Sequence, residues 1–422
     1  MTAVLPSIAA LLLGVALLLL GSGLQGTLLG IRGSIEAFSP LLIGLIMTAY
    51  YVGFAAGCVF GARLIERVGH IRAFAAFASI ASATAVIFPV ALDPFSWIIL
   101  RAITGYCFAG LYMVIESWLN ERIPNAHRGR LLAVYMIVNL SAIAGAQQLL
   151  NLADPAGYAL FILSSVLVSV ALVPVALTTT TVPSPVPTAR MRLSEIYEIS
   201  PLGVVGALGI GLANGAMWGL IPLASIQSGL STAQIATLMS VIVLGGVVFQ
   251  WPIGRLSDLL DRRHVIIGAS LIMAFSSVAL FFVSPLDQTS TLALGFVLGG
   301  MNLVVYPLCA AHINDRIEHE DLVQASAALL LVFGVGAAAG PLLGGLIMQG
   351  FGPLALYLYI GVVSFLLVGF GVYRLTVRRA TPDSEQVAFE PVGPAPTSPV
   401  LDPRIDPEDL EWEDRGSGHA NQ

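Results

Sequence analysis

The stretch that decides the fold is the charged run Gly254-Arg-Leu-Ser-Asp-Leu-Leu-Asp-Arg-Arg263, which lies between two long apolar runs. A weaker copy, Leu64-Ile-Glu-Arg-Val-Gly-His-Ile-Arg72, lies about 190 residues earlier. Both stretches follow the second long apolar run of their half of the chain. Two equivalent charged connections at this spacing predict a duplicated membrane protein with two parallel halves.

The composition is that of a protein surrounded by lipid. Of 422 residues, 57% are hydrophobic and 10% are charged, whereas about 25% of the residues in a typical soluble domain are charged. Ten of the 25 acidic residues follow Ala380, so the net charge of -6 belongs largely to the tail. Cys58, Cys107 and Cys309 lie singly in apolar runs, which predicts no disulfide framework and no metal site. We expect no cofactor.

Twelve apolar runs are each about 20 residues long, the length that an α-helix needs to cross a bilayer. We therefore expect an all-α integral membrane protein with 12 transmembrane helices. No basic region precedes the first run, so we interpret it as a spanning helix and not as a removable signal peptide. The runs cover about residues 7–29, 40–63, 72–91, 95–118, 131–152, 156–178, 200–224, 233–254, 264–284, 290–312, 323–348 and 353–375.

Arginine is distributed unevenly over the connections between these runs. With a cytoplasmic N-terminus, the even-numbered connections and the start of the tail carry fifteen arginines, whereas the other connections carry only Arg32. Because basic residues concentrate on the cytoplasmic side, we predict a multi-pass protein of the plasma (inner) membrane with both termini cytoplasmic. The fifteen are Arg63, Arg67, Arg72, Arg122, Arg128, Arg130, Arg190, Arg192, Arg255, Arg262, Arg263, Arg316, Arg374, Arg378 and Arg379.

The connection 179–199 divides the chain into two sets of six runs. Three prolines between positions 183 and 187 favour extended chain, so this segment is predicted to be a cytoplasmic linker. We expect one six-helix half at 1–178 and a second at 200–378. The proline-rich, acidic segment 379–422 is predicted to be a disordered cytoplasmic tail.

Matching residues recur in the two halves. Glu66 matches Asp258 at an offset of 192 residues. The segment Asn120-Glu-Arg-Ile123 matches Asn314-Asp-Arg-Ile317 at an offset of 194. Because the offset changes so little, we predict two pseudo-symmetric six-helix bundles related by an axis along the membrane normal.

These motifs resemble those of the major facilitator superfamily (MFS). The run from Gly254 to Arg263 is similar to its loop signature, and Arg101-Ala-Ile-Thr-Gly105 resembles its helix-4 arginine motif. Glu116-Ser-Trp-Leu-Asn120, together with His312-Ile-Asn-Asp315, resembles the YcaD-like bacterial branch. Gly145-Ala-Gln-Gln148 lacks the proline that many exporters carry here, which puts drug-type antiport in doubt.

The resemblance implies a transporter that rocks one six-helix half against the other around a central site. The charged stretches would then form a cytoplasmic latch, in which carboxylates and arginines pair across the halves in one state and separate in the other. The alternative is that these charges only fix the topology. The latch candidates are Glu66 with Arg67 and Arg72, and Asp258 with Arg262 and Arg263.

The run 95–118 carries the most informative ionisable groups. At 100° per residue, Arg101 and Tyr112 lie about 20° apart on the helix and Glu116 about 40° further round, so all three share a face. Arg101 is expected to hold an anionic group in the cavity, or else to extend its stem to the outer interface. Glu116, about 22 Å from Arg101 along the axis, is expected to bind a proton or to pair with an arginine of the first charged stretch.

Polar residues on the other inner helices extend the predicted cavity, because the resemblance implies that helices 1, 4, 7 and 10 line the path. Each of these residues could equally serve helix packing. On helix 11, Gly336, Gly340 and Gly344 recur every four residues, and with Pro341 they are predicted to allow close packing and bending. The further cavity candidates are Gln25, Asn214, Trp218, Asn302 and Tyr306.

The sequence therefore favours a secondary active transporter of a small organic solute that works by alternating access, as a proton-coupled symporter or antiporter. A membrane sensor or receptor, a lipid or lipophile flippase, and a drug exporter on the same fold are the alternatives. No catalytic or phosphate-binding motif predicts an enzyme, and no pattern predicts nucleic-acid binding. We expect a monomer in the lipid bilayer, with the solute and protons as its partners.

Overall fold

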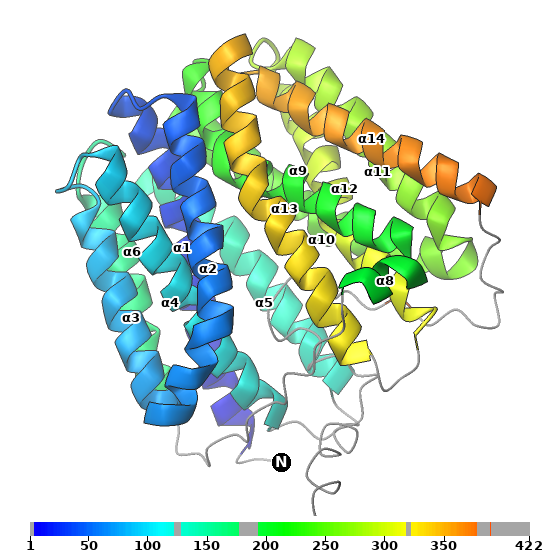
Figure 1. The fold of residues 1–422 in the computed structure, drawn as a ribbon. Coiled ribbons are helices and arrows are strands. Elements are labelled where there is room, and N and C mark those ends of the chain that lie inside the picture. Colours follow the sequence, from blue (N-terminus) through cyan, green and yellow to red (C-terminus); the bar gives the residue numbers. More distant parts are fainter. Residues whose placement is uncertain (1–3, 122–127, 177–192, 318–321, 378–388, 390–422) are drawn as a thin grey trace, which may run out of the picture.

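The fold is entirely α-helical, apart from one 3-10 turn, over the residues that the computed structural model describes, which are 4–121, 128–176, 193–317, 322–377 and 389. The helices form two groups that lie side by side (Figure 1). They are α1 (Val4–Ile35), α2 (Pro40–Val68), α3 (His70–Ile87), α4 (Pro94–Glu121), α5 (Arg128–Gln148), the 3-10 turn η2 (Leu149–Leu152), α6 (Ala159–Val170), α7 (Leu172–Ala176), α8 (Leu193–Ile199), α9 (Pro201–Gln227), α10 (Thr232–Leu259), α11 (Arg262–Val283), α12 (Gln288–Asn314), α13 (Leu322–Phe351) and α14 (Ala355–Val377).

Eleven helices in the described part of the chain are long and apolar enough to cross a membrane, and a shorter apolar helix spans Ala159–Val175. The predicted 12-helix architecture is confirmed, with a difference in the sixth span. The run at 156–178 forms α6 and α7 instead of one continuous helix. Pro174 in α7 has no N–H to donate to the carbonyl group of Val170, and α6 ends at that residue.

The two charged stretches are largely helical, which corrects their interpretation as loops. Residues 254–259 form the end of α10, and α11 begins at Arg262. Asp261 caps α11, because its carboxylate accepts a hydrogen bond from the N–H of Arg263 at 3.0 Å. In the first copy, only Gly69 separates α2 from α3, with a φ of 86° that favours glycine. The charged side chains are therefore held on helix ends.

The same close helix contact occurs in both halves, between α2 and α4 and between α10 and α12. A Cβ at Gly53 would overlap the carbonyl oxygen of Ala102, and a Cβ at Gly245 would overlap that of Phe296. These glycines are 192 positions apart and the two carbonyl groups 194 apart, which are the offsets of the sequence repeat. Small residues such as glycine allow the backbones of two membrane helices to approach closely. The same backbone contact therefore occurs once in each half of the repeat.

The two halves touch each other at one end of the molecule. A Cβ at Gly44 on α2 would overlap the carbonyl oxygen of Pro341 on α13. One turn further, the hydroxyl of Thr48 donates to the carbonyl oxygen of Ala338 at 2.7 Å. From this closed end, α2 and α13 diverge toward the bottom of Figure 1. We call the bottom the basic end, because it holds both charged stretches.

Gly105→Ala should destabilise the protein. A Cβ at Gly105 would overlap the carbonyl oxygen of Tyr50, so α2 and α4 would have to separate, at a cost on the order of 1–3 kcal/mol. Thermal unfolding of the purified protein in detergent measures this. The control is Gly268→Ala on α11, where no neighbouring atom lies within 4 Å and alanine should be neutral or stabilising. Equal melting temperatures for the two variants would contradict the close contact.

Candidate functional site

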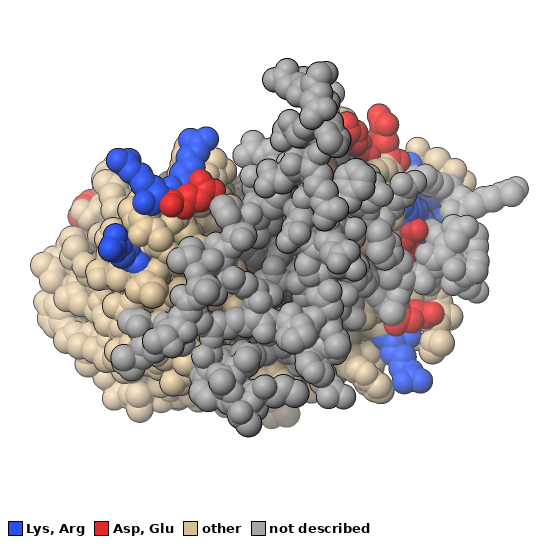
Figure 2. All heavy atoms as spheres, turned by 90° about the horizontal axis from the view of Figure 1, so that it is seen from below, with Lys and Arg blue, Asp and Glu red and all other residues tan. Residues whose placement is uncertain are grey.

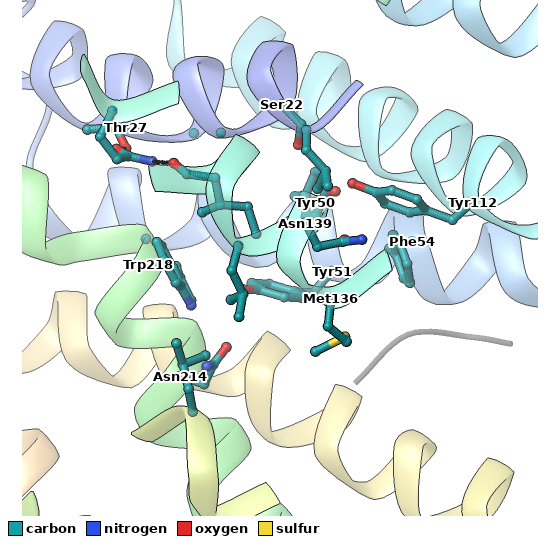
Figure 3. Close-up of a pocket in the computed structure, with 18 of the residues that line it drawn as sticks. Ser22, Thr27, Tyr50, Tyr51, Phe54, Tyr112, Met136, Asn139, Asn214 and Trp218 are labelled. Atoms are coloured by element: carbon teal, nitrogen blue, oxygen red, sulfur yellow. Dashed lines mark hydrogen bonds between the residues drawn. The ribbon is translucent and has the colours of Figure 1, made fainter. Parts of the chain in front are cut away.

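A cavity of about 370 Å³ lies between the two halves. Its walls come from α1, α2, α4 and α5 on one side and from α9, α10 and α12 on the other. Figure 3 shows the aromatic and polar side chains that face it. Of the predicted cavity residues, four line it, namely Arg101, Tyr112, Asn214 and Trp218, and so does the proton-coupling candidate Glu116. The other three, Gln25, Asn302 and Tyr306, are buried outside its lining.

Arg101 is buried in the α4 wall of the cavity, with 7% of its surface exposed. Its guanidinium carbon lies 4.6 Å from the ring centre of Tyr50, and a terminal nitrogen lies 3.4 Å from the sulfur of Met47. The Nε of Arg101 has no hydrogen-bond partner among the described residues, and none of their carboxylates pairs with the guanidinium. The side chain therefore faces the cavity and does not extend to the membrane surface.

Glu116 lies on the same face of α4, nearer the basic end, and is 1% exposed. The hydroxyl of Tyr135 on α5 donates to its carboxylate at 2.7 Å. Asn139, one turn further along α5, donates to the backbone carbonyl oxygen of Tyr135 at 2.8 Å and also lines the cavity. A carboxylate, a phenol and an amide thus form a polar group at this end, suited to holding or passing a proton.

The wall from the C-terminal half carries no charged residue among the described lining residues. The amide nitrogen of Asn214 donates to the side-chain oxygen of Asn302 at 2.7 Å, so Asn302 orients the cavity amide from behind. Trp218 follows Asn214 by one turn of α9, and both face the cavity (Figure 3). Tyr306 packs edge-on against Phe333, with ring centres 4.9 Å apart. The ionisable groups of the site therefore come from one half only.

An aromatic group on α2 also lines the cavity and is not among the residues predicted from the sequence. Tyr50, Tyr51 and Phe54 line the cavity, and the ring centre of Phe54 lies 6.3 Å from that of Tyr112. Figure 3 shows Phe54 beside Tyr112, and Tyr51 nearer the middle of the view. Two adjacent tyrosines inside a long apolar run were the available signal, because a phenol at membrane depth needs a polar partner or a cavity.

The predicted packing residues of α13 lie against α9 and α2. Cβ atoms at Gly336 and Gly340 would overlap backbone carbonyl oxygens of α9. A Cβ at Gly344 would come within 2.9 Å of the side chain of Leu220. Pro341 forms the contact with α2 at the closed end described above. This helix is therefore packed on both sides at the end where the halves meet.

Charged side chains gather in separate groups on two sides of the basic end (Figure 2). In the C-terminal half, Arg262 pairs with Asp258 and with Asp315, each at 3.0 Å. Arg263 pairs with Asp261 at 2.6 Å, and Asp261 is the residue that caps the same helix. Burial raises the pKa of Asp261, but hydrogen bonds and charge from Arg263 outweigh it and hold that pKa below its ordinary value.

The latch candidates of the N-terminal half are exposed, and they are Glu66, Arg67 and Arg72. Every ion pair between described residues joins two groups of the same half. Asp258 has a further contact, because the backbone N–H of Phe389 donates to its carboxylate at 2.9 Å while the phenylalanine ring lies against Gly254. Within the described residues, the predicted pairing across the halves is therefore not formed in this structure.

Comparison with known sequences points to one family. The model of the Major Facilitator Superfamily matches residues 11–205 and, a second time, residues 203–408. A protein of Salmonella heidelberg (strain SL476), described as the uncharacterized MFS-type transporter YcaD, is 30% identical over 332 residues, which cover 77% of this chain and 84% of that protein. The YcaD protein of Salmonella typhi is 30% identical over 328 residues with the same coverage.

Solved structures share the fold at low sequence identity. A variant of the nucleoside transporter NupG superposes with a TM-score of 0.74 at 14% identity, covering 87% of this chain and 100% of that one. A bacterial homologue of the lysosomal transporter Spinster, inward-facing and occupied, gives 0.70 at 14% identity over 89% and 97%. A D-xylose–proton symporter gives 0.63 at 14% identity over 90% and 98%. The chain is a multi-pass membrane protein that belongs to the major facilitator superfamily, in its YcaD-like branch.

Proposed function

We propose that the protein is a secondary active transporter, which moves a small organic solute across the plasma membrane by alternating access. The observation that supports this most is the cavity between two six-helix halves that touch at the closed end. Halves that rock about such a site expose it to one side of the membrane at a time. The similar structures of a nucleoside transporter and a xylose–proton symporter have the same fold.

In this proposal the basic end faces the cytoplasm, because arginine concentrates there. Both termini are then cytoplasmic, and the closed end seals the cavity from the outside. The state described is inward-facing. In the outward-facing state, the exposed Glu66, Arg67 and Arg72 approach the charged end of α10 and form the latch across the halves with Asp258.

Glu116 is the proposed proton carrier. It is the carboxylate that lines the cavity among the described residues, and it is almost fully buried. Tyr135 donates a hydrogen bond to it at 2.7 Å, a bond that favours the charged form. Solute or helix movement that changes this contact would change how tightly the carboxylate holds a proton, and this links proton binding to the transport cycle.

Locking the closed end should stop transport. Thr48→Cys and Ala338→Cys, in a background without the three native cysteines, place one thiol on each half at that contact. After crosslinking, proteoliposomes should no longer take up solutes from a defined mixture of small organic compounds, as followed by mass spectrometry, and a reductant should restore uptake.

The matched control for this lock is Ser82→Cys with Ser165→Cys, since those two hydroxyls lie 2.7 Å apart within the N-terminal half. Crosslinking there should leave uptake unchanged. Undiminished uptake by the locked protein, or no uptake of any solute by the uncrosslinked protein, would contradict the proposed transport cycle.

Glu116→Gln should uncouple transport from protons. The amide cannot carry the proton, so accumulation driven by a pH gradient should be lost while solute exchange without a gradient continues. Glu36→Gln is the control, because Glu36 pairs with Arg32 at 2.7 Å and lies outside the cavity lining. Full gradient-driven accumulation by Glu116→Gln protein would remove Glu116 as the carrier.

Asp258→Asn should shift the protein toward the inward-facing state, because the latch holds the outward-facing one. Exposed ion pairs contribute about 0.2–1 kcal/mol, so the ratio of states should change by up to about fivefold. The rate at which a thiol reagent labels a cavity cysteine from the cytoplasmic side reports the shift. Asp287→Asn, at the cap of α12, is the control. Equal labelling rates in Asp258→Asn and unaltered protein would reject the latch.

A further inference from the structure

Arg101 differs from every other buried arginine in the described residues. Arg32 pairs with Glu36, Arg262 with two aspartates, and Arg263 with Asp261. Arg101 is as buried as Arg32 and Arg263, at 7% exposure, yet no carboxylate of the described residues pairs with it. A guanidinium cannot lose its proton under ordinary conditions, so this charge is permanent. In a membrane protein, such a charge calls for an anionic partner from outside the chain.

The contacts that Arg101 does make leave its hydrogen-bonding capacity largely unused. A guanidinium offers five N–H donors in a planar fork that matches a carboxylate. Here one terminal nitrogen points to the sulfur of Met47, which is a weak acceptor, and Nε has no partner. The ring of Tyr50 covers one face of the guanidinium. The fork therefore remains available to a bound anion at the cavity wall.

The rest of the cavity suits a planar apolar body. Tyr50, Tyr51 and Phe54 from α2 and Trp218 from α9 line it, and Figure 3 shows them around one space. A volume of about 370 Å³ is at the small end of ligand sites. Glu116 follows Arg101 in α4 at a helix rise of about 22 Å, so its carboxylate is not next to an anion at the arginine. The amide of Asn214 offers a neutral contact on the opposite wall.

The geometry points to a small organic anion as the solute, with its carboxylate on the guanidinium of Arg101 and its aromatic or other planar apolar body against Tyr50, Tyr51 and Trp218. This inference rests on the transport function proposed above. It excludes amines and uncharged sugars as preferred solutes, because neither neutralises the arginine.

Three probes of matched shape test the charge requirement: phenylacetate, phenylacetamide and phenethylamine. Their binding to the purified full-length protein is measured by calorimetric titration at neutral pH. A panel of other aromatic and aliphatic monocarboxylates is then titrated in the same way. Phenylacetate should bind at least tenfold more tightly than its amide and its amine, since the gain from a charge-assisted hydrogen bond corresponds to about that factor. Equal binding of acid and amide, tighter binding of the amine, or no binding by any carboxylate would overturn the inference.

Arg101→Gln tests the residue. It should weaken phenylacetate binding by roughly 10- to 100-fold and leave phenylacetamide binding unchanged. Arg255→Gln is the matched control, because Arg255 also lies over an aromatic ring, 5.7 Å from the centre of Trp251, but outside the cavity lining. Unchanged phenylacetate binding by folded Arg101→Gln protein would overturn the assignment. If that variant does not fold, the comparison of acid with amide on the unaltered protein decides.

Counterflow in proteoliposomes separates this inference from the transport proposal. Entry of labelled phenylacetate in exchange for internal phenylacetate supports both. Binding without exchange of any solute leaves the anion site standing and refutes transport. Exchange of amines or neutral solutes, with no effect of Arg101→Gln, leaves transport standing and refutes the anion site.

Discussion

Helices gain little from leaving lipid for one another, so close backbone contact is the interaction on which this bundle depends. Glycines bring α2 against α4 in the N-terminal half, and α10 against α12 in the C-terminal half. The two contacts lie at matching positions of the repeat. Gly211 and Gly215 of α9 meet carbonyl oxygens of α13 in the same way. Such contacts make each half a compact unit, and the cavity lies between the units instead of inside either one. In the transport cycle proposed above, a rocking motion would change access to the site without repacking the halves.

The duplicated halves have diverged in their charge. At the offset of 194, Arg101 corresponds to Gly295 and Glu116 to Ala310, so the ionisable pair has no counterpart in the second half. Because a charge in hydrocarbon is costly, the protein keeps both groups on one face of α4, and amides and a tryptophan form the opposite wall. Among the described lining residues, one half thus carries the charged groups of the cavity, while the other lines it with neutral side chains.

The architecture could be predicted because the length of the apolar runs and the offset of the repeat can be read directly from the sequence. The break at Pro174 was also visible, but hydropathy alone passes over it. Helical periodicity groups Arg101, Tyr112 and Glu116 on one face, and all three line the cavity. Periodicity does not say which face of helix 2 turns inward, so Tyr50 and Tyr51 were missed. Periodicity also does not show how far a residue lies from the cavity surface. It therefore did not reveal that Asn302 and Tyr306 are buried behind the cavity wall.

Between the described residues, the contacts of α2 with α13 at the closed end involve no full charge. Gly44 meets a carbonyl group of Pro341, and the hydroxyl of Thr48 donates to a backbone oxygen. Dispersion and neutral hydrogen bonds act only at contact distance, whereas the charges of the basic end act over about 8 Å at physiological salt. The two kinds of interaction therefore have different ranges: the contacts at the closed end are lost as soon as the atoms separate, whereas the charges at the basic end interact across a gap of several ångströms. Ionic strength should tune the second and leave the cohesion of the first almost unchanged.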